Sequence, residues 1–107
     1  EPLSSFQLIQ AKLADLATNA EAIRHFVRYV AWLHAQGVNC SKEAAMVKLF
    51  ASRLATQATL ECFQIHGGYG FMTEYAVNRY FREGKILEVG EGTNEIQQLL
   101  IARELGC

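Results

Sequence analysis

The residues best suited to chemistry lie in the run Gly90-Glu91-Gly92-Thr93, where a carboxylate stands between two glycines. Neighbours without side chains would leave the Glu91 carboxylate open to a bound ligand. Thr93 is a candidate N-cap, and a helix that begins there offers unpaired N–H donors and the positive end of its dipole. Glu91 is therefore a candidate general base, a role that needs a partly desolvated carboxylate. The same run also fits an ordinary acid at a loop-to-helix junction, and taken alone that interpretation is favoured.

A second glycine-rich run, Gln64-Ile65-His66-Gly67-Gly68-Tyr69-Gly70-Phe71, has two interpretations. It fits a helix end followed by a turn, which taken alone is the favoured interpretation. It would also allow close approach of the backbone to a phosphate-bearing ligand. The run is neither a P-loop nor a dinucleotide fingerprint, because no Gly-Lys-Ser/Thr follows it and no strand precedes it.

The histidines and cysteines are dispersed along the chain rather than clustered. They are His25, His34, His66, Cys40, Cys62 and Cys107. Because these residues lack the spacing of metal ligands, we expect no metal site. An odd number of cysteines argues against a disulfide framework and for a reducing compartment.

The composition indicates one small domain. The chain has 107 residues, half of them apolar, and a net charge of −1 that is spread along the sequence. No basic patch favours nucleic-acid binding, and no apolar run approaches the roughly 18 residues of a membrane span. The start of the chain shows no signal-peptide pattern. In line with the reducing compartment that the cysteines favour, we expect a cytoplasmic protein, or a mitochondrial-matrix protein if the source is eukaryotic. The chain begins at Glu1 rather than Met, which suggests a piece of a longer protein.

Apolar residues with helical spacing predict the elements that must position these runs. A stripe with alternating spacings of three and four covers the first third of the chain; its members are Phe6, Ile9, Leu13, Leu16, Ala20, Ile23, Val27 and Val30. We expect helices at about residues 5–36, 41–65, 73–82 and 93–106. The fold class is therefore all-α, an up-down four-helix bundle with two long and two shorter helices.

Single residues predict where these helices begin and end. Ser4 or Ser5 would cap the first helix, and Gly37 would follow it. Ser41 would cap the second helix. Gly84 would stop the third, which leaves residues 85–89 as an extended or turn-like connection. The last helix would begin at Thr93.

The two glycine-rich runs together resemble the C-terminal domain of the acyl-CoA dehydrogenases. Their order and separation match that family, and the match covers essentially all of the chain. The intervening and flanking matches are Thr73-Glu74-Tyr75, Arg82, Lys85-Ile86, Asn94-Glu95-Ile96-Gln97 and Ala102-Arg103. Family members have an N-terminal helical domain, a middle β-domain and a C-terminal four-helix bundle. The resemblance implies that residues 1–107 form only the last of these, with the other two domains absent from the chain.

The resemblance also implies roles for individual residues. Glu91 would remove the α-proton of an acyl-CoA thioester while a β-hydride passes to N5 of FAD, and its backbone N–H would help to hold the thioester oxygen. Gln64, Gly67 and Gly68 would contact the adenine and diphosphate end of an FAD bound mainly to a neighbouring subunit. Thr93 and Glu95 would lie near the flavin, and Gly92 would line the thioester. Gly90 stands where some relatives carry an aromatic residue, so it would widen the acyl pocket.

The resemblance finally implies the partners of the protein. They are an acyl-CoA substrate, an electron-transfer flavoprotein or similar acceptor, and further copies of the chain in a dimer or tetramer. The alternative interpretation is a non-catalytic helical oligomerisation module, whose glycines are only caps and turns. Without the other two domains, we expect the isolated chain to be inactive.

Overall fold

The computed structural model describes residues 2–67, 76–90 and 92–107. Within these ranges a short 3₁₀ turn, η1 (Leu3–Ser5), precedes four α-helices: α1 (Gln7–Ala35), α2 (Ser41–His66), α3 (Ala76–Val89) and α4 (Asn94–Glu104). The described residues form no strand. The predicted all-α fold, with two long and two shorter helices, is therefore confirmed.

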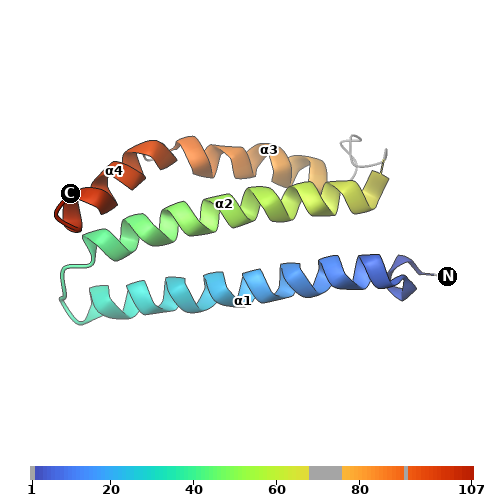
Figure 1. Cartoon of the computed structure of the whole chain (residues 1–107), viewed down its shortest axis with the longest axis horizontal. Helices are drawn as coiled ribbons and strands as arrows, with labels where there is room; N and C mark the ends of the chain where they lie inside the picture. Colours follow the sequence, from blue (N-terminus) through green and yellow to red (C-terminus); the bar gives the residue numbers. More distant parts are fainter. Residues whose placement is uncertain (1, 68–75, 91) are drawn as a thin grey trace.

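Helix α2 is the common partner of the other three helices. Figure 1 shows α1 along one side of α2, with α3 and α4 following one another along the other side. Packing contacts join α2 to α1, to α3 and to α4. The chain runs up α1, back along α2, and returns through α3 and α4. The molecule is elongated, with extents of 52 × 25 × 23 Å. Residues at the two ends of α2 therefore belong to different regions of the surface.

Helix α1 begins differently from the prediction. Neither Ser4 nor Ser5 caps it, because both belong to the η1 turn, where the Ser5 hydroxyl donates to the Pro2 carbonyl at 2.8 Å. The N-cap is Phe6, whose carbonyl accepts the first helical hydrogen bond and whose side chain makes no cap bond. The predicted end is confirmed, since Gly37 follows α1 with a φ of +74°.

Helix α2 begins at Ser41, one residue earlier than predicted, because a cap at Ser41 would have made Lys42 the first helical residue. The N-cap position is taken by Cys40, and the capping acceptor is the side chain of Asn39. Asn39 Oδ1 accepts from the Ser41 backbone N–H at 3.1 Å and from its hydroxyl at 2.9 Å. An amide side chain two residues ahead thus satisfies a free donor of the first turn.

Helix α3 contradicts the prediction that Gly84 stops it. The helix continues through Gly84 to Val89, so residues 85–89 are helical rather than a connection. A glycine inside a helix costs about 0.5–1 kcal/mol relative to alanine, which packing can offset. Gly84 is buried and, with Ala55 and Thr59 of α2, lines a shallow apolar cavity between the helices. The expected start at residues 73–74 lies outside the described residues.

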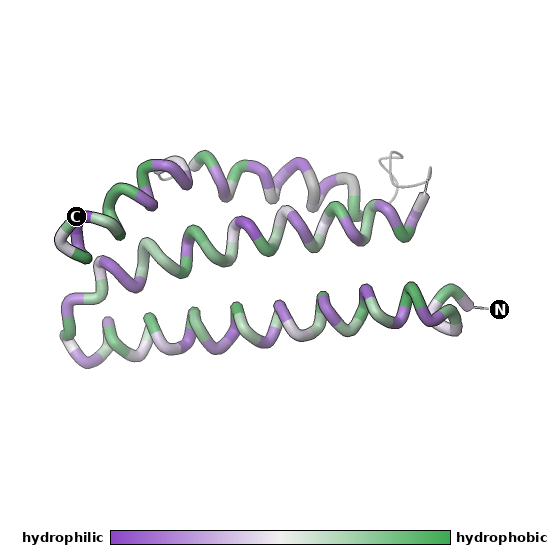
Figure 2. The backbone as a smooth tube through the Cα atoms, viewed as in Figure 1, coloured by the Kyte–Doolittle hydropathy of each residue, from purple (hydrophilic) through white to green (hydrophobic). Residues whose placement is uncertain are grey.

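The described residues bury few side chains fully. Apolar residues are buried only at Leu33, Ala45 and Val77. Figure 2 shows hydrophobic residues recurring along α1, and the main helical packing partner of α1 among the described residues is α2. As a result much of its predicted apolar stripe stays open, including Leu13 and Val27. Large exposed apolar faces of this kind mark interaction surfaces.

Candidate functional site

The segment between α3 and α4 carries the principal candidate residues. Glu91 itself lies outside the described residues, so its predicted role as base stays a prediction. The predicted cap at Thr93 is confirmed, since Thr93 Oγ1 accepts from the Ile96 backbone N–H at 3.2 Å. Helix α4 therefore begins at Asn94, three residues after Glu91 in the sequence, and the positive end of its dipole lies at the Thr93 cap.

Both glycines beside Glu91 lie close to other atoms. Gly92 has a φ of +94°, and a Cβ there would lie 2.8 Å from Nε2 of Gln97. A Cβ on Gly90 would lie 2.9 Å from the carbonyl oxygen of Ile86, within the last turn of α3. A side chain at position 90 would therefore require the end of α3 to shift. The predicted contacts of Gly90 and Gly92 with a substrate stay predictions.

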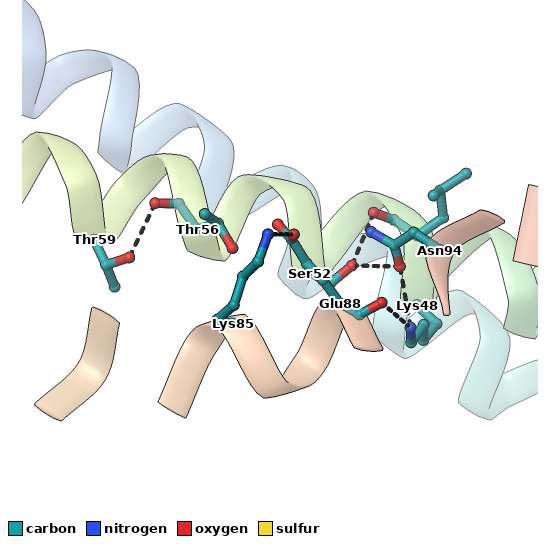
Figure 3. A network of polar contacts seen from close by, with 8 residues as sticks. Lys48, Ser52, Thr56, Thr59, Lys85, Glu88 and Asn94 are labelled. Atoms are coloured by element: carbon teal, nitrogen blue, oxygen red, sulfur yellow. Dashed lines mark hydrogen bonds and ion pairs between the residues drawn. The ribbon is translucent and has the colours of Figure 1, made fainter. Parts of the chain in front are cut away.

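A lysine from α2 contacts this segment on both sides of position 91. Lys48 Nζ donates to the Gly92 carbonyl at 2.7 Å, to the Glu88 carbonyl at 3.3 Å and to Asn94 Oδ1 at 3.0 Å. Figure 3 shows Lys48, Glu88 and Asn94 close together, from α2, α3 and the start of α4. Lys48 was not among the predicted site residues. Its only sequence signal is a charge between Val47 and Leu49 on a largely apolar helix.

Two buried polar residues extend this network. Ser52 is 2% exposed and Asn94 is 8% exposed. The Ser52 hydroxyl lies 3.1 Å from Asn94 Oδ1 and 3.2 Å from the Leu49 carbonyl. Burying a polar group is costly unless it is hydrogen-bonded, so these contacts hold the first residue of α4 against α2.

An ion pair lies on the adjoining surface of α3. Lys85 Nζ donates to Glu88 Oε2 at 2.8 Å. This hydrogen bond lowers the pKa of Glu88, and the nearby Thr56 hydroxyl acts in the same direction, while burial opposes both. The same contact raises the pKa of Lys85. Both groups are therefore charged at neutral pH, and the pair belongs to the fold of the segment rather than to a proton-transfer site.

The second glycine-rich run lies at the opposite end of α2. Gln64 is exposed and its carbonyl accepts from the Gly67 backbone N–H, while Gly68 lies outside the described residues. Gln64 and Lys48 are 16 residues apart, about 24 Å at the rise of an α-helix. The structure therefore does not bring Gln64 and Gly67 together with Gly92 and Thr93. Two separate regions carry the predicted site residues.

Gly67 follows α2 as its C-cap and has a positive φ. Gly67 is exposed with a φ of +62°, and nothing lies within 4 Å of the place a Cβ would take. A phosphate-bearing group can approach this backbone closely, which fits the predicted role at the diphosphate end of FAD. Glu95 is exposed in the first turn of α4. Its predicted contact with the flavin stays a prediction, as does that of Thr93.

The described ranges lack two other kinds of feature, a metal-binding cluster and a membrane-spanning helix. No three His, Cys, Asp or Glu residues there are grouped as a metal site would require. No helix among these residues combines the length and apolar character needed to cross a bilayer.

Comparison with known proteins decides the family. Residues 1–106 match the family model described as acyl-CoA dehydrogenase, C-terminal domain. The chain belongs to the acyl-CoA dehydrogenase family. An acyl-CoA dehydrogenase of Bacillus subtilis (strain 168) is 52% identical over 104 residues, which are 97% of this chain and 27% of that relative.

Solved structures of acyl-CoA dehydrogenase relatives share the fold. Butyryl-CoA dehydrogenase from Megasphaera elsdenii matches with a TM-score of 0.96 and 40% identity, over 100% of this chain and 28% of that one. The FAD complex of PigA matches with a TM-score of 0.90 and 31% identity, over 97% of this chain and 27% of that one. The chain thus spans about a quarter of the length of these relatives. The family resemblance and the helical fold predicted from the sequence are confirmed.

Proposed function

We propose that this chain is the C-terminal domain of an FAD-dependent acyl-CoA dehydrogenase, which oxidises the α,β bond of an acyl-CoA thioester. In this proposal residues 1–107 form one domain, and a helical domain and a β-domain precede it in the parent protein. The observation that carries the proposal is the family match over residues 1–106, with Glu91 two residues before Thr93, the cap of helix α4, in the sequence.

Glu91 acts as the general base in the proposed reaction. Its carboxylate takes the α-proton of the thioester, and the bound FAD supplies the acceptor for the β-hydride. Because that proton is weakly acidic, the pKa of Glu91 must rise, and the apolar acyl chain would raise it by displacing water. The Glu91 N–H and the positive end of the α4 dipole would stabilise negative charge that develops on the thioester oxygen.

The remaining site residues divide between two FAD molecules. Gln64, Gly67 and Gly68 would hold the adenine and diphosphate end of an FAD bound mainly to a neighbouring subunit. Thr93 and Glu95 would lie near the flavin of the chain's own site, where Gly92 and Gly90 would face the substrate. The open, exposed backbone at Gly67 supports the first assignment. The proposal therefore requires at least two copies of the chain, in a dimer or tetramer.

The proposed partners follow the same assignment. They are an acyl-CoA thioester and an electron-transfer flavoprotein or a similar electron acceptor. The proposed location is the cytoplasm, or the mitochondrial matrix in a eukaryote.

Replacement of the base tests the proposal. In the full-length parent, Glu91→Gln should retain FAD, judged by the flavin absorbance of the purified protein, but lose reduction of the flavin by acyl-CoA. General base catalysis typically contributes about 10²- to 10⁴-fold, so the rate should fall by at least that range. Glu83→Gln is the matched control, because Glu83 is exposed on α3 and should leave the rate unchanged. Wild-type reduction by Glu91→Gln would contradict the assignment.

A second candidate function is a helical oligomerisation module. The observation that favours it is the open apolar stripe of α1, with Leu13 and Val27 exposed. It predicts that the chain self-associates and binds no FAD. Light scattering that finds a strict monomer would count against it, and a yellow protein would favour the first candidate. The two functions are compatible, since one domain can serve both in the parent enzyme.

A further inference from the structure

The Lys48 ammonium stands between the end of α3 and the start of α4. Its contacts are the Gly92 carbonyl at 2.7 Å, Asn94 Oδ1 at 3.0 Å and the Glu88 carbonyl at 3.3 Å. A lysine ammonium has three N–H donors, so each of these acceptors can receive one of them. Figure 3 shows Lys48 reaching Glu88 and Asn94 from α2. The lysine thus joins three elements at one point.

The three acceptors lie at the end of α3, at the start of α4 and in the segment between these helices. Glu88 lies in the last turn of α3, where carbonyls lack intrahelical donors and the helix dipole is negative. Gly92 lies outside both helices, where it precedes the Thr93 cap. Hydrogen bonds from a charged donor are stronger than neutral ones. Lys48 therefore donates charged hydrogen bonds to a backbone carbonyl at the end of α3 and to one in the segment before α4.

These contacts bracket position 91. One accepting residue, Glu88, comes three residues before it, and the other two, Gly92 and Asn94, follow it within three residues. Asn94 Oδ1 accepts a second hydrogen bond, from the buried Ser52 hydroxyl at 3.1 Å. Lys48 and Ser52 are four residues apart, so they share one face of α2. Helix α2 thus holds described residues on both sides of position 91 in the sequence.

We propose that Lys48 is a positioning residue for the proposed reaction: its ammonium holds the Glu88 and Gly92 carbonyls and Asn94, which flank Glu91 in the sequence, and the rate of α-proton removal by Glu91 depends on these contacts. This inference rests on the proposed function of Glu91 as the base. Lys48 acts through the backbone and exchanges no proton with the substrate. Displacing a catalytic group by about 1 Å can cost on the order of 10²-fold in rate.

Lys48→Met in the full-length parent removes the donors and keeps an unbranched stem. The expected result is a fall of about 10- to 100-fold in kcat for flavin reduction, with FAD content and KM close to wild type. Exchange of the substrate α-proton with solvent deuterium, followed by NMR, should slow by the same factor. Hydrogen exchange of the backbone amides of residues 88–94, measured in the FAD-free protein, should speed up.

Two further lysine variants make the measurement specific. Lys42→Met is the matched control, because Lys42 is on the same helix and pairs only loosely with Glu43 at 3.8 Å; its kcat should equal the wild-type value. Lys48→Arg keeps the charge but not the three-fold donor geometry, so its kcat should lie between those of wild type and Lys48→Met. If Lys48→Met does not fold, Lys48→Arg carries the test, and a wild-type kcat there overturns the inference.

A double-mutant cycle separates positioning from a general structural role. If Lys48 acts through Glu91, adding Lys48→Met to Glu91→Gln should lower the residual rate no further. A further loss equal to that of the single variant overturns the inference. The outcomes also separate the two proposals. Normal reduction by Glu91→Gln refutes the base assignment, whereas an inactive Glu91→Gln with a normal Lys48→Met refutes only the role of Lys48.

Discussion

At the residue scale, Gly92 is fixed both by its backbone and by a neighbour. Its φ is +94°, and a Cβ would lie 2.8 Å from Nε2 of the buried Gln97. Gly92→Ala should therefore destabilise the protein by about 1–3 kcal/mol, measured by chemical denaturation. Gly106→Ala is the matched control, because its φ is +91° but nothing lies within 4 Å. A larger loss for Gly106→Ala than for Gly92→Ala would contradict this explanation.

The pKa of Glu88 is a second residue-scale property. The Lys85 ammonium donates to this carboxylate and lowers its pKa. A carboxylate whose pKa is lower in the folded state contributes stability above its unfolded pKa, and that contribution is lost as the pH falls through the folded pKa. The net effect on stability should be small, since Lys85 is exposed.

Lys85→Met tests this cause directly. The variant should raise the pKa of Glu88 toward its ordinary value, as followed by the NMR shift of the carboxylate carbon during an acid titration. Lys12→Met is a control, because Lys12 pairs instead with Glu61 at 3.4 Å. An unchanged pKa in Lys85→Met would show that another group holds the Glu88 carboxylate charged.

At the scale of the element, Gly84 lies inside α3 rather than at its end. The position is helical and buried, and nothing lies within 4 Å of a Cβ built there. Gly84→Ala should therefore stabilise the protein by about 0.5–1 kcal/mol through higher helix propensity. Gly37→Ala should do the opposite, since Gly37 has a φ of +74°. Thermal unfolding of the two variants measures both changes in stability. A lower stability of Gly84→Ala would contradict the explanation that a side chain fits at that position.

Local signals in the sequence predicted most of the helices. The apolar spacing of α1 and the cap at Thr93 act over a few residues, so they can be recognised without the rest of the fold. The stop at Gly84 was wrong because packing of α3 against α2 outweighs the low helix propensity of glycine. The predicted cap at Ser4 or Ser5 was wrong because both residues belong to the short 3₁₀ turn that precedes α1.

The Lys48 contacts could not be predicted in the same way. Lys48 and its acceptors at Glu88, Gly92 and Asn94 are at least 40 residues apart in the sequence. Only the antiparallel packing of α2 against α3 and α4 brings them together. The role of Glu91, by contrast, was inferred from the family resemblance, since its own run of residues also fits an ordinary helix junction.

At the scale of the whole molecule, α2 is covered on two sides, whereas α1 packs mainly against α2 among the described helices. Every large side chain among the described residues is at least 2% exposed. Leu13, Val27 and Trp32 are exposed to solvent. A domain that buries so little apolar surface has a small hydrophobic contribution to its stability. We therefore expect the isolated chain to unfold at a lower temperature than the same domain within the parent. Circular dichroism melts of both proteins measure this, and equal midpoints would contradict it.

The central claim, that Glu91 is the base of an acyl-CoA dehydrogenase, is tested most directly by anaerobic stopped-flow absorbance. The full-length Glu91→Gln protein, loaded with FAD, is mixed with an acyl-CoA that reduces the wild type, and the flavin band is followed. We predict that the band persists in Glu91→Gln and bleaches in the Glu83→Gln control. Bleaching of Glu91→Gln at the wild-type rate would contradict the claim.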